Sequence, residues 1–282
     1  MYITVNGHAT YCYTGGKTLD AAKPSIVFIH GVLNDHSVWI LQSRYLANHG
    51  YNVLAIDLPG HGKSAGSCPK SVEEAAAFAI ALLDAAGIAK TALVGHSWGS
   101  LIALHAASLV PARITHLAML ATAFPMKVSP ALLDAALNKP MQAIDMVNTF
   151  SHSTLAPPPS SLGPGTWLYG SSRALMRRVL QSNPRENGFH IGFSACNDYA
   201  TGLEALASWN TAQAATLFIV GKQDQMTPPK AAQALINAAK EAKVVTVEAG
   251  HSILTEAPDA TLCALQDFLK PQPAPCSLPP KT

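Results

Sequence analysis

Short runs of apolar residues recur along the first half of the chain and are separated by longer, mixed stretches. A run that is apolar at nearly every position predicts a strand that is buried on both faces, as in a parallel sheet. Two further short strands are predicted at residues 2–6 and 9–14, around an Asn6-Gly7 turn typical of a hairpin. The clearest apolar runs are Ser25–Ile29, Asn52–Ile56, residues 92–94 and Ile114–Leu120.

The stretches between these runs carry the signals of helix ends. Ser71 and Glu74 form a capping box, in which the side chain of each residue can accept the backbone amide of the other. The helix that begins there is predicted to run to about residue 86 and to end at Gly87. A second helix is predicted from 97 to about 109, before Pro111. This alternation of strands and helices predicts a doubly wound α/β fold with a parallel sheet.

The alternation breaks off after residue 122 and resumes near residue 210. No strand is predicted in between, and a loop rich in Pro and Gly is predicted at 157–165. We therefore predict a helical cap at 123–209 that divides an α/β core into residues 1–122 and 210–270, followed by a Pro-rich disordered tail at 271–282. Helices of the cap are predicted near 130–138, 140–150, 171–182 and 198–208. The second part of the core is predicted to hold strands near 216–220 and 244–247 and a helix near 260–269.

Composition narrows the range of functions. Hydrophobic residues make up 49% of the 282 residues and charged residues 13%, which suits one folded α/β domain with a large core. The net charge of +2, without a basic block interleaved with aromatic residues, argues against nucleic acid as a partner. The five cysteines are scattered and form no Cys-x-x-Cys pair, so no metal site or other cofactor is predicted. No apolar run is long enough to span a membrane and the first residues do not form a secretory signal, so we expect a cytoplasmic monomer or homodimer.

The segment Gly95-His96-Ser97-Trp98-Gly99 lies between a predicted strand and a predicted helix. A sharp turn at this position would project the Ser97 hydroxyl above the sheet, and the glycines would let strand and helix pack closely around it. The amides at the start of the following helix would favour negative charge that develops nearby. Ser97 is therefore the candidate nucleophile.

A serine hydroxyl needs a base that takes its proton, and a histidine suits this role. Among the 11 histidines, His251 is preferred because it follows the predicted strand at 244–247, and open α/β sheets place their sites beyond the carboxyl ends of the strands. His96 is interpreted as structural, although it adjoins Ser97. His30 and His61 lie in turn motifs, where a histidine ring more often satisfies backbone groups.

The base needs a carboxylate that orients it, and Asp224 follows the predicted strand at 216–220. The resulting order of Ser97, Asp224 and His251 along the chain is that of hydrolases with a nucleophile elbow. Asp57 also follows a strand, but it is expected to hold the turn Pro59–Gly62 that comes after it.

Stabilisation of an oxyanion requires two amide donors near the nucleophile. One is expected from the backbone of Trp98, the residue after Ser97, and the other from the loop after Ser25–Ile29. The amide of Val32 is the preferred second donor, with that of Leu33 as the alternative.

Five segments follow one another along the chain: His30-Gly31, Asp57-Leu58-Pro59-Gly60-His61-Gly62-Lys63-Ser64, Gly95–Gly99, Gly221-x-x-Asp224-x-x-x-Pro228 and Gly250-His251. Together they resemble the α/β-hydrolase superfamily along nearly all of residues 20–270. The resemblance implies a mostly parallel eight-stranded sheet with a helical cap inserted after the sixth strand, and it is most similar to the small, capped bacterial carboxylesterases. Dehalogenases and epoxide hydrolases of this fold use an aspartate nucleophile, whereas this chain has Ser97. Proline iminopeptidases usually have His-Gly-Gly-Pro-Gly at the first loop, which this chain lacks.

These features predict hydrolysis of a small-molecule carboxylic ester with an apolar acyl or alcohol part, through an acyl-enzyme on Ser97. The same residues leave open thioesters, lactones, amides and C–C bonds, since fold and triad do not determine the substrate. A ligand-binding receptor and a lyase that uses the same serine and histidine are the alternatives of other classes. The residues predicted to contact the substrate are Val32, Trp98, Phe124, Met146 and Phe150.

Overall fold

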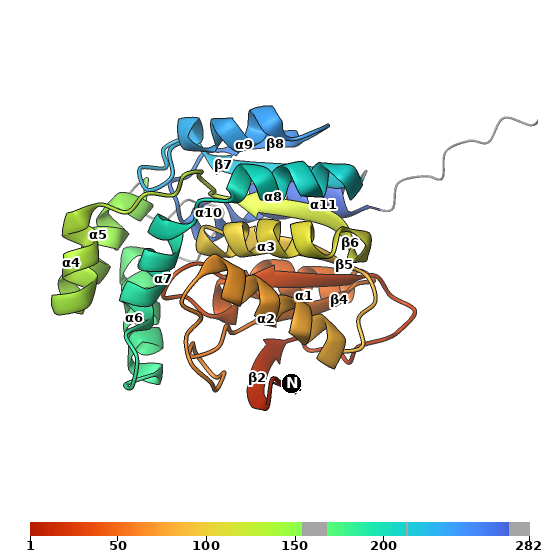
Figure 1. Cartoon of the computed structure of the whole chain (residues 1–282), viewed down its shortest axis with the longest axis horizontal. Coiled ribbons are helices and arrows are strands. Elements are labelled where there is room, and N and C mark those ends of the chain that lie inside the picture. Colours follow the sequence, from red (N-terminus) through yellow and green to blue (C-terminus); the bar gives the residue numbers. More distant parts are fainter. Residues whose placement is uncertain (154–167, 213, 271–282) are drawn as a thin grey trace, which may run out of the picture.

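Eight strands form one sheet in the computed structural model, which describes residues 1–153, 168–212 and 214–270 (Figure 1). Their order is β1-β2-β4-β3-β5-β6-β7-β8. β1 pairs antiparallel with β2 and β2 antiparallel with β4, whereas all other neighbours are parallel. The predicted mostly parallel sheet is thereby confirmed. The strands are β1 (Tyr2–Val5), β2 (His8–Tyr13), β3 (Ser25–Ile29), β4 (Asn52–Ile56), β5 (Thr91–His96), β6 (Ile114–Leu120), β7 (Ala215–Gly221) and β8 (Lys243–Val247).

Burial along the strands explains why the apolar runs were readable in the sequence. Every residue of β3, β4 and β5 is buried, because helices cover both faces of the central sheet. β8 lies at the edge of the sheet and buries only Val247 fully. Because β5, β6, β7 and β8 run parallel, the carboxyl ends of β5, β7 and β8 share one edge of the sheet, where loops can meet.

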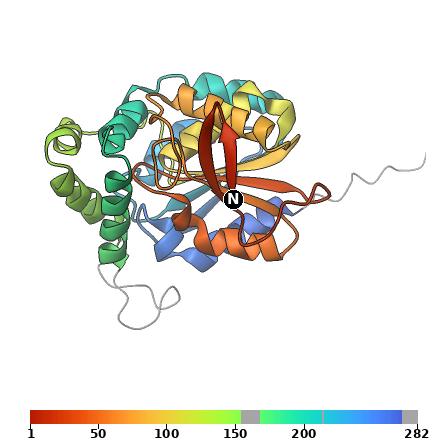
Figure 2. The ribbon, with the colours of Figure 1, turned by 90° about the horizontal axis from the view of Figure 1, so that it is seen from below.

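Helices pack on both faces of the sheet and enclose two apolar cores (Figure 2). One face is covered by α2 (Val72–Ala85), α3 (Trp98–Leu109), α8 (Gly202–Trp209) and α9 (Gln233–Ala238), and the other by α1 (Ile40–Asn48), α10 (Ile253–Glu256) and α11 (Pro258–Leu269). The hydroxyl of Ser71 caps α2 by accepting the amide of Glu74 at 3.1 Å, as the sequence predicts, whereas the carboxylate of Glu74 accepts the amide of Lys70 at 2.7 Å instead of that of Ser71. Short 3₁₀ helices are found at His36–Trp39, Pro111–Arg113, Asn210–Ala212 and Pro229–Ala232.

Four helices between β6 and β7 gather beside the sheet domain: α4 (Pro130–Asn138), α5 (Pro140–Ser151), α6 (Leu168–Ser182) and α7 (Gly188–Asp198) (Figure 1). α8 comes next along the chain, but it packs against α3 and α9 on the face of the sheet. The segment 123–209, expected as a cap, thus includes one helix that belongs to the layer covering the sheet. The predicted loop at 157–165 and the predicted tail at 271–282 lie outside the described residues. Among the described residues, no helix is both long and apolar enough to cross a membrane.

Candidate active site

Ser97 lies in the turn that joins β5 to α3, in a backbone conformation that is rare for a residue with a side chain. Its φ is 55° and its ψ is −121°. Such strain persists only where the surrounding structure enforces it, and it is common at functional sites. Here the turn brings Ser97 to the carboxyl edge of the sheet, as expected for a nucleophile elbow.

The two glycines that flank Ser97 at a distance of two residues make this turn sterically possible. A Cβ atom at Gly95 would lie 2.0 Å from the carbonyl oxygen of Gly99, and a Cβ atom at Gly99 would lie 2.3 Å from the carbonyl oxygen of Ile29. Neither neighbour is a flexible side chain that could move away. The G-x-S-x-G pattern is therefore required by the close approach of α3 to β5 and β3.

Three predicted residues form one hydrogen-bonded line at this edge. His251 follows β8 and Asp224 follows β7. Nε2 of His251 lies 2.9 Å from Oγ of Ser97, and Nδ1 of His251 lies 2.9 Å from Oδ2 of Asp224. His251 and Asp224 are both buried. This geometry allows a base to take the serine proton while a carboxylate holds the ring of that base.

Asp224 is fixed by the turn that it begins. Its Oδ1 accepts the amides of Met226 and Thr227, each at 2.8 Å, and its Oδ2 accepts the hydroxyl of Thr227 at 2.7 Å. Burial raises the pKa of the carboxyl, but the neighbouring His251 and these hydrogen bonds outweigh it, so that the pKa of Asp224 lies below its ordinary value. Thr227 also lies 3.0 Å from Nδ1 of His251 and was not among the predicted site residues.

His30 and His61, two other histidines considered in the sequence, form no hydrogen bond with the Ser97 hydroxyl. His30 accepts the amide of Leu58 through Nε2 at 3.1 Å, and Nδ1 of His61 lies 3.0 Å from the carbonyl of Pro59. Burial lowers the pKa of His30; burial and the neighbouring His30 lower the pKa of His61 to about 4. Both rings satisfy backbone groups in the loops that border the site.

The loop after β3 approaches Ser97 closely. A Cβ atom at Gly31 would lie 3.2 Å from Cβ of Ser97, so the loop passes close to Ser97, and Val32 lines the larger cavity together with Ser97. No hydrogen bond within the described part of the chain uses the amide of Val32 or that of Trp98. Both amides are thus available to an oxyanion, and they remain the candidate donors.

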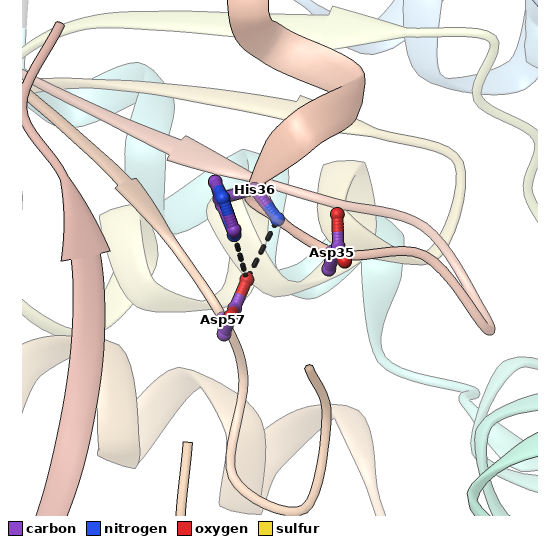
Figure 3. A group of neighbouring side chains, drawn as sticks. All are labelled: Asp35, His36 and Asp57. Carbon is purple, nitrogen blue, oxygen red and sulfur yellow. Dashed lines mark hydrogen bonds and ion pairs between the residues drawn. The ribbon is translucent and has the colours of Figure 1, made fainter. Parts of the chain in front are cut away.

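Asp57, the alternative carboxylate, pairs with a different histidine. Its Oδ1 accepts the backbone amide of His36 at 2.7 Å and lies 2.8 Å from Nδ1 of the same residue (Figure 3). Its Oδ2 accepts the amide of Lys63 at 2.9 Å. Asp57 therefore connects the loop after β3 to the loop after β4. The sequence predicts only that it holds the turn in the loop after β4.

Asp35, His36 and Asp57 form a group of possible metal ligands, with one ligand atom of each within 4.8 Å of the others (Figure 3). Their oxygens already accept hydrogen bonds from the protein. Asp35 accepts the amide and hydroxyl of Ser37 through Oδ1, and the guanidinium of Arg178 through Oδ2 at 2.7 Å. These hydrogen bonds connect the loop after β3 to the loop after β4, and the contact of Asp35 with Arg178 connects the loop after β3 to α6.

Two cavities open at Ser97. The larger has a volume of about 510 Å³ and the smaller about 290 Å³, and four residues line both of them: Ser97, Phe193, Met226 and His251. Of the predicted substrate contacts, Val32 lines the larger cavity, and Met146 and Phe150 line the smaller one.

Two predicted substrate contacts have side chains elsewhere. Phe124 lines neither cavity; its ring packs against Tyr199 and against Gly202, where a Cβ atom would lie 2.5 Å from it. The indole of Trp98 is fully buried in the core and also lines neither cavity, so its backbone amide is the part of Trp98 that stays a candidate contact.

The sequence of this chain is similar to those of known proteins with an α/β fold. The profile of the alpha/beta hydrolase fold family matches residues 24–258. The chain is 38% identical over 99 residues to the "Dihydrolipoyllysine-residue acetyltransferase component of acetoin cleaving system" of Pseudomonas putida, covering 35% of this chain and 26% of that protein. It is 34% identical over 99 residues to an epoxide hydrolase of Caballeronia sordidicola, covering 34% of this chain and 30% of that protein. The chain thus spans less than a third of each of these two relatives.

The solved structure of an enol-lactonase from Burkholderia xenovorans LB400 has the same fold. It superposes with a TM-score of 0.80 at 23% sequence identity, over 96% of this chain and 100% of that one. With the family profile matching most of its length, this chain belongs to the alpha/beta hydrolase fold family.

Proposed function

We propose that this protein hydrolyses small-molecule carboxylic esters through an acyl-enzyme on Ser97. One observation carries the proposal: the hydrogen-bonded line from Ser97 through His251 to Asp224 ends in a hydroxyl that faces both cavities. A nucleophile, its base and the orienting carboxylate are the parts that acyl transfer needs.

In the first half of the reaction, Oγ of Ser97 attacks the ester carbonyl carbon while Nε2 of His251 takes the serine proton. The carbonyl oxygen gains the negative charge and accepts the amides of Val32 and Trp98. When the tetrahedral intermediate collapses, the C–O bond to the alcohol breaks and His251 gives its proton to the leaving oxygen. Asp224 keeps the proton of Nδ1 in place and stabilises the cationic ring.

In the second half, water takes the place of the alcohol. His251 removes a proton from the water, the hydroxide oxygen attacks the acyl carbon, and the C–O bond to Ser97 breaks. Ser97 regains its proton from His251, and the acid leaves. In both halves of the reaction, His251 accepts and donates each proton that is transferred.

The two cavities suit the two arms of an ester. The smaller one is lined by Met126, Val128, Leu132, Met146 and Phe150 together with the polar Lys127, Ser129, Gln225 and Thr227, and methionine adapts to varied apolar groups. The larger one mixes apolar residues with the polar groups of Asn34, Ser37, Ser172, Arg178 and Thr255. Both cavities thus mix apolar and polar residues and differ in size, so a substrate with one short arm and one longer arm fits them.

A lactone is the second candidate, because it is an ester closed into a ring and would react by the same steps. The fold of the enol-lactonase supports this option only as a likeness of fold. The relative named an epoxide hydrolase is a weaker guide, since this chain has Ser97 where epoxide hydrolases of this fold use an aspartate.

The test is hydrolysis of p-nitrophenyl esters from acetate to long acyl chains by wild type and Ser97→Ala, with mass spectrometry of the wild type after reaction with a fluorophosphonate. Ser108→Ala is the matched control, because Ser108 lies on the same helix and its hydroxyl donates only to the carbonyl of His105. We expect turnover and labelling of Ser97 in the wild type and in Ser108→Ala, and neither in Ser97→Ala. Turnover that survives in Ser97→Ala would refute the proposal.

A further inference from the structure

The main chain around His251 is held at three successive residues by groups from other parts of the fold. The amide of Gly250 donates to Oε2 of Glu256 at 2.7 Å, and the carbonyl of His251 lies 2.9 Å from Nε2 of His96. The amide of Ser252 donates to the carbonyl of Ser151 at 3.0 Å. This loop lies between β8 and α10, so regular secondary structure does not fix it.

The hydrogen bond from His96 has a defined direction. Burial and the neighbouring His251 lower the pKa of His96 to about 3, so its ring is neutral at ordinary pH and carries one proton. A carbonyl oxygen can only accept, so that proton must lie on Nε2. Nδ1 is buried and has no partner among the described residues. The one hydrogen bond of this ring in the described part of the chain therefore goes to the carbonyl of His251.

Glu256 contacts the same loop at Gly250. The carboxylate is buried, and its Oε1 accepts the amide of Ser153 at 2.8 Å and the hydroxyl of Ser153 at 2.6 Å. With the amide of Gly250, three donors compensate the loss of water around the charge. Glu256 thereby connects the loop between β8 and α10 to Ser153, which follows α5.

We propose that His96 and Glu256 are positioning residues, which hold the main chain of His251 so that its Nε2 stays within hydrogen-bond reach of Ser97. This inference rests on the proposed function, in which His251 is the base. A displacement of a catalytic group by about 1 Å can lower the rate by about 100-fold. The sequence analysis interprets His96 as structural, and this inference specifies what the residue holds in place. Glu256 was not considered in the sequence.

Two pairs of variants separate positioning from general packing. In His96→Gln the amide nitrogen can take the place of Nε2, whereas in His96→Asn it reaches only the place of Nδ1. Glu256→Gln brings an NH₂ group against N–H donors, whereas Ser153→Ala removes one hydroxyl and keeps the bond from Gly250. His105→Asn is the matched control. The half-buried ring of His105 lies on α3, eight residues after Ser97, and its one hydrogen bond among the described residues is with the hydroxyl of Tyr199.

We expect kcat for p-nitrophenyl acetate to fall by about 10- to 100-fold in His96→Asn and Glu256→Gln, with KM little changed. His96→Gln and Ser153→Ala should stay within about threefold of wild type, and His105→Asn should equal it. In proton NMR, the downfield resonance of the His251 Nδ1 proton should persist in wild type and His96→Gln and be broadened in His96→Asn. Thermal unfolding checks that all variants fold.

The outcomes distinguish the inference from the proposed function. Equal kcat and equal NMR spectra in His96→Gln and His96→Asn would overturn the role of His96, and unchanged kcat in Glu256→Gln would overturn that of Glu256. A wild type that neither turns over esters nor reacts with a fluorophosphonate would instead refute the proposed function. The NMR comparison of the two His96 variants decides the inference even then.

Discussion

The hydroxyl of Thr227 lies 2.7 Å from Oδ2 of Asp224, the same oxygen that faces Nδ1 of His251. It also lies 3.0 Å from the carbonyl oxygen of Ala121. A hydroxyl has one hydrogen, so it can serve one of these two acceptors at a time. The contact with the carboxylate is the shorter and the charged one, so we expect Thr227 to stabilise the ionised form of Asp224.

Replacing Thr227 should therefore weaken, but not abolish, the action of Asp224. Thr227→Val should lower kcat about tenfold, since a hydrogen bond to a charged group contributes about 1.5 kcal/mol or more. Asp224→Asn should lower it by about 10⁴-fold, because the amide favours the wrong tautomer of His251. Thr227→Ser keeps the hydroxyl and should restore the rate. Steady-state kinetics of the three variants decide this, and a Thr227→Ser variant as slow as Thr227→Val would argue that packing is the cause.

The packing of α7 against the loop after β3 gives a second prediction. A Cβ atom at Gly192 would lie 3.1 Å from both methyl carbons of Val32, whose amide is a candidate oxyanion donor. Gly192→Ala should push this loop and lower kcat about three- to tenfold, a fraction of the effect of losing a whole donor. KM should change less, because the donor acts on charge that develops in the transition state.

Gly188→Ala is the control for this experiment. A Cβ atom there would be as tightly placed, 3.1 Å from Sγ of Cys68, but it would not touch Val32. Gly188→Ala should leave kcat near that of wild type at a similar loss of thermal stability. If both variants lose kcat to the same extent, the effect comes from α7 as a whole and not from Val32.

Gly188 and Gly192 also explain why α7 was not predicted from the sequence. Glycine disfavours helices, so the segment Gly188–Asp198 lacks a helical signal. The helix forms because its glycine face fits against residues far away in the chain, such as Val32 and Trp98. Local sequence patterns do not contain such contacts. The strands were predictable because burial on both faces gives each of them an apolar run of its own.

The same distinction applies to the candidate site. Ser97, Asp224 and His251 were predicted as a group because each follows a predicted strand, and the edge of a parallel sheet brings strand ends together, as the hydrogen bonds among the three show. Phe124 was expected at the substrate because it is apolar and lies in the predicted cap. Its ring packs against Tyr199 instead, since the direction of a side chain depends on tertiary packing. Thr227 carried a weak signal, the spacing of three residues after Asp224 that suits a turn closed by an aspartate.

Buried neutral histidines should make stability depend on pH. The pKa of His61 is lowered by burial and the neighbouring His30 to about 4, whereas in the unfolded chain it is near 6.5. Between these values the unfolded chain binds a proton that the folded chain does not, so the free energy of unfolding falls as the pH falls through this window. His61→Gln should reduce this slope by up to about 1.4 kcal/mol per pH unit.

Urea unfolding at several pH values between about 4 and 8 measures this slope in wild type and in His61→Gln. Above about pH 7 both proteins should have the same, nearly flat dependence, which serves as the internal control. Parallel curves across the whole range would contradict the prediction, because they would mean that His61 takes up its proton equally in the folded and unfolded chains.

The two cavities at Ser97 predict that the two arms of a substrate can be blocked separately. Met146 lines the smaller cavity from α5, and Leu175 lines the larger one from α6. Met146→Trp and Leu175→Trp should each fill one cavity and leave the hydrogen-bonded line from Ser97 to Asp224 intact. Each methylene that a filled cavity no longer accommodates is worth about 0.8 kcal/mol, or roughly fourfold in kcat/KM.

The measurement uses two ester series, one with a growing acyl chain on a constant alcohol and one with a growing alcohol on a constant acetyl group. Met146→Trp should truncate the chain-length dependence of one series and Leu175→Trp that of the other, while both variants hydrolyse the shortest ester at the wild-type rate. The series that each variant truncates then identifies which cavity holds the acyl group. If either variant shortens both series equally, the cavities do not hold separate arms, because a long chain on either side of the ester bond would then be entering the same space.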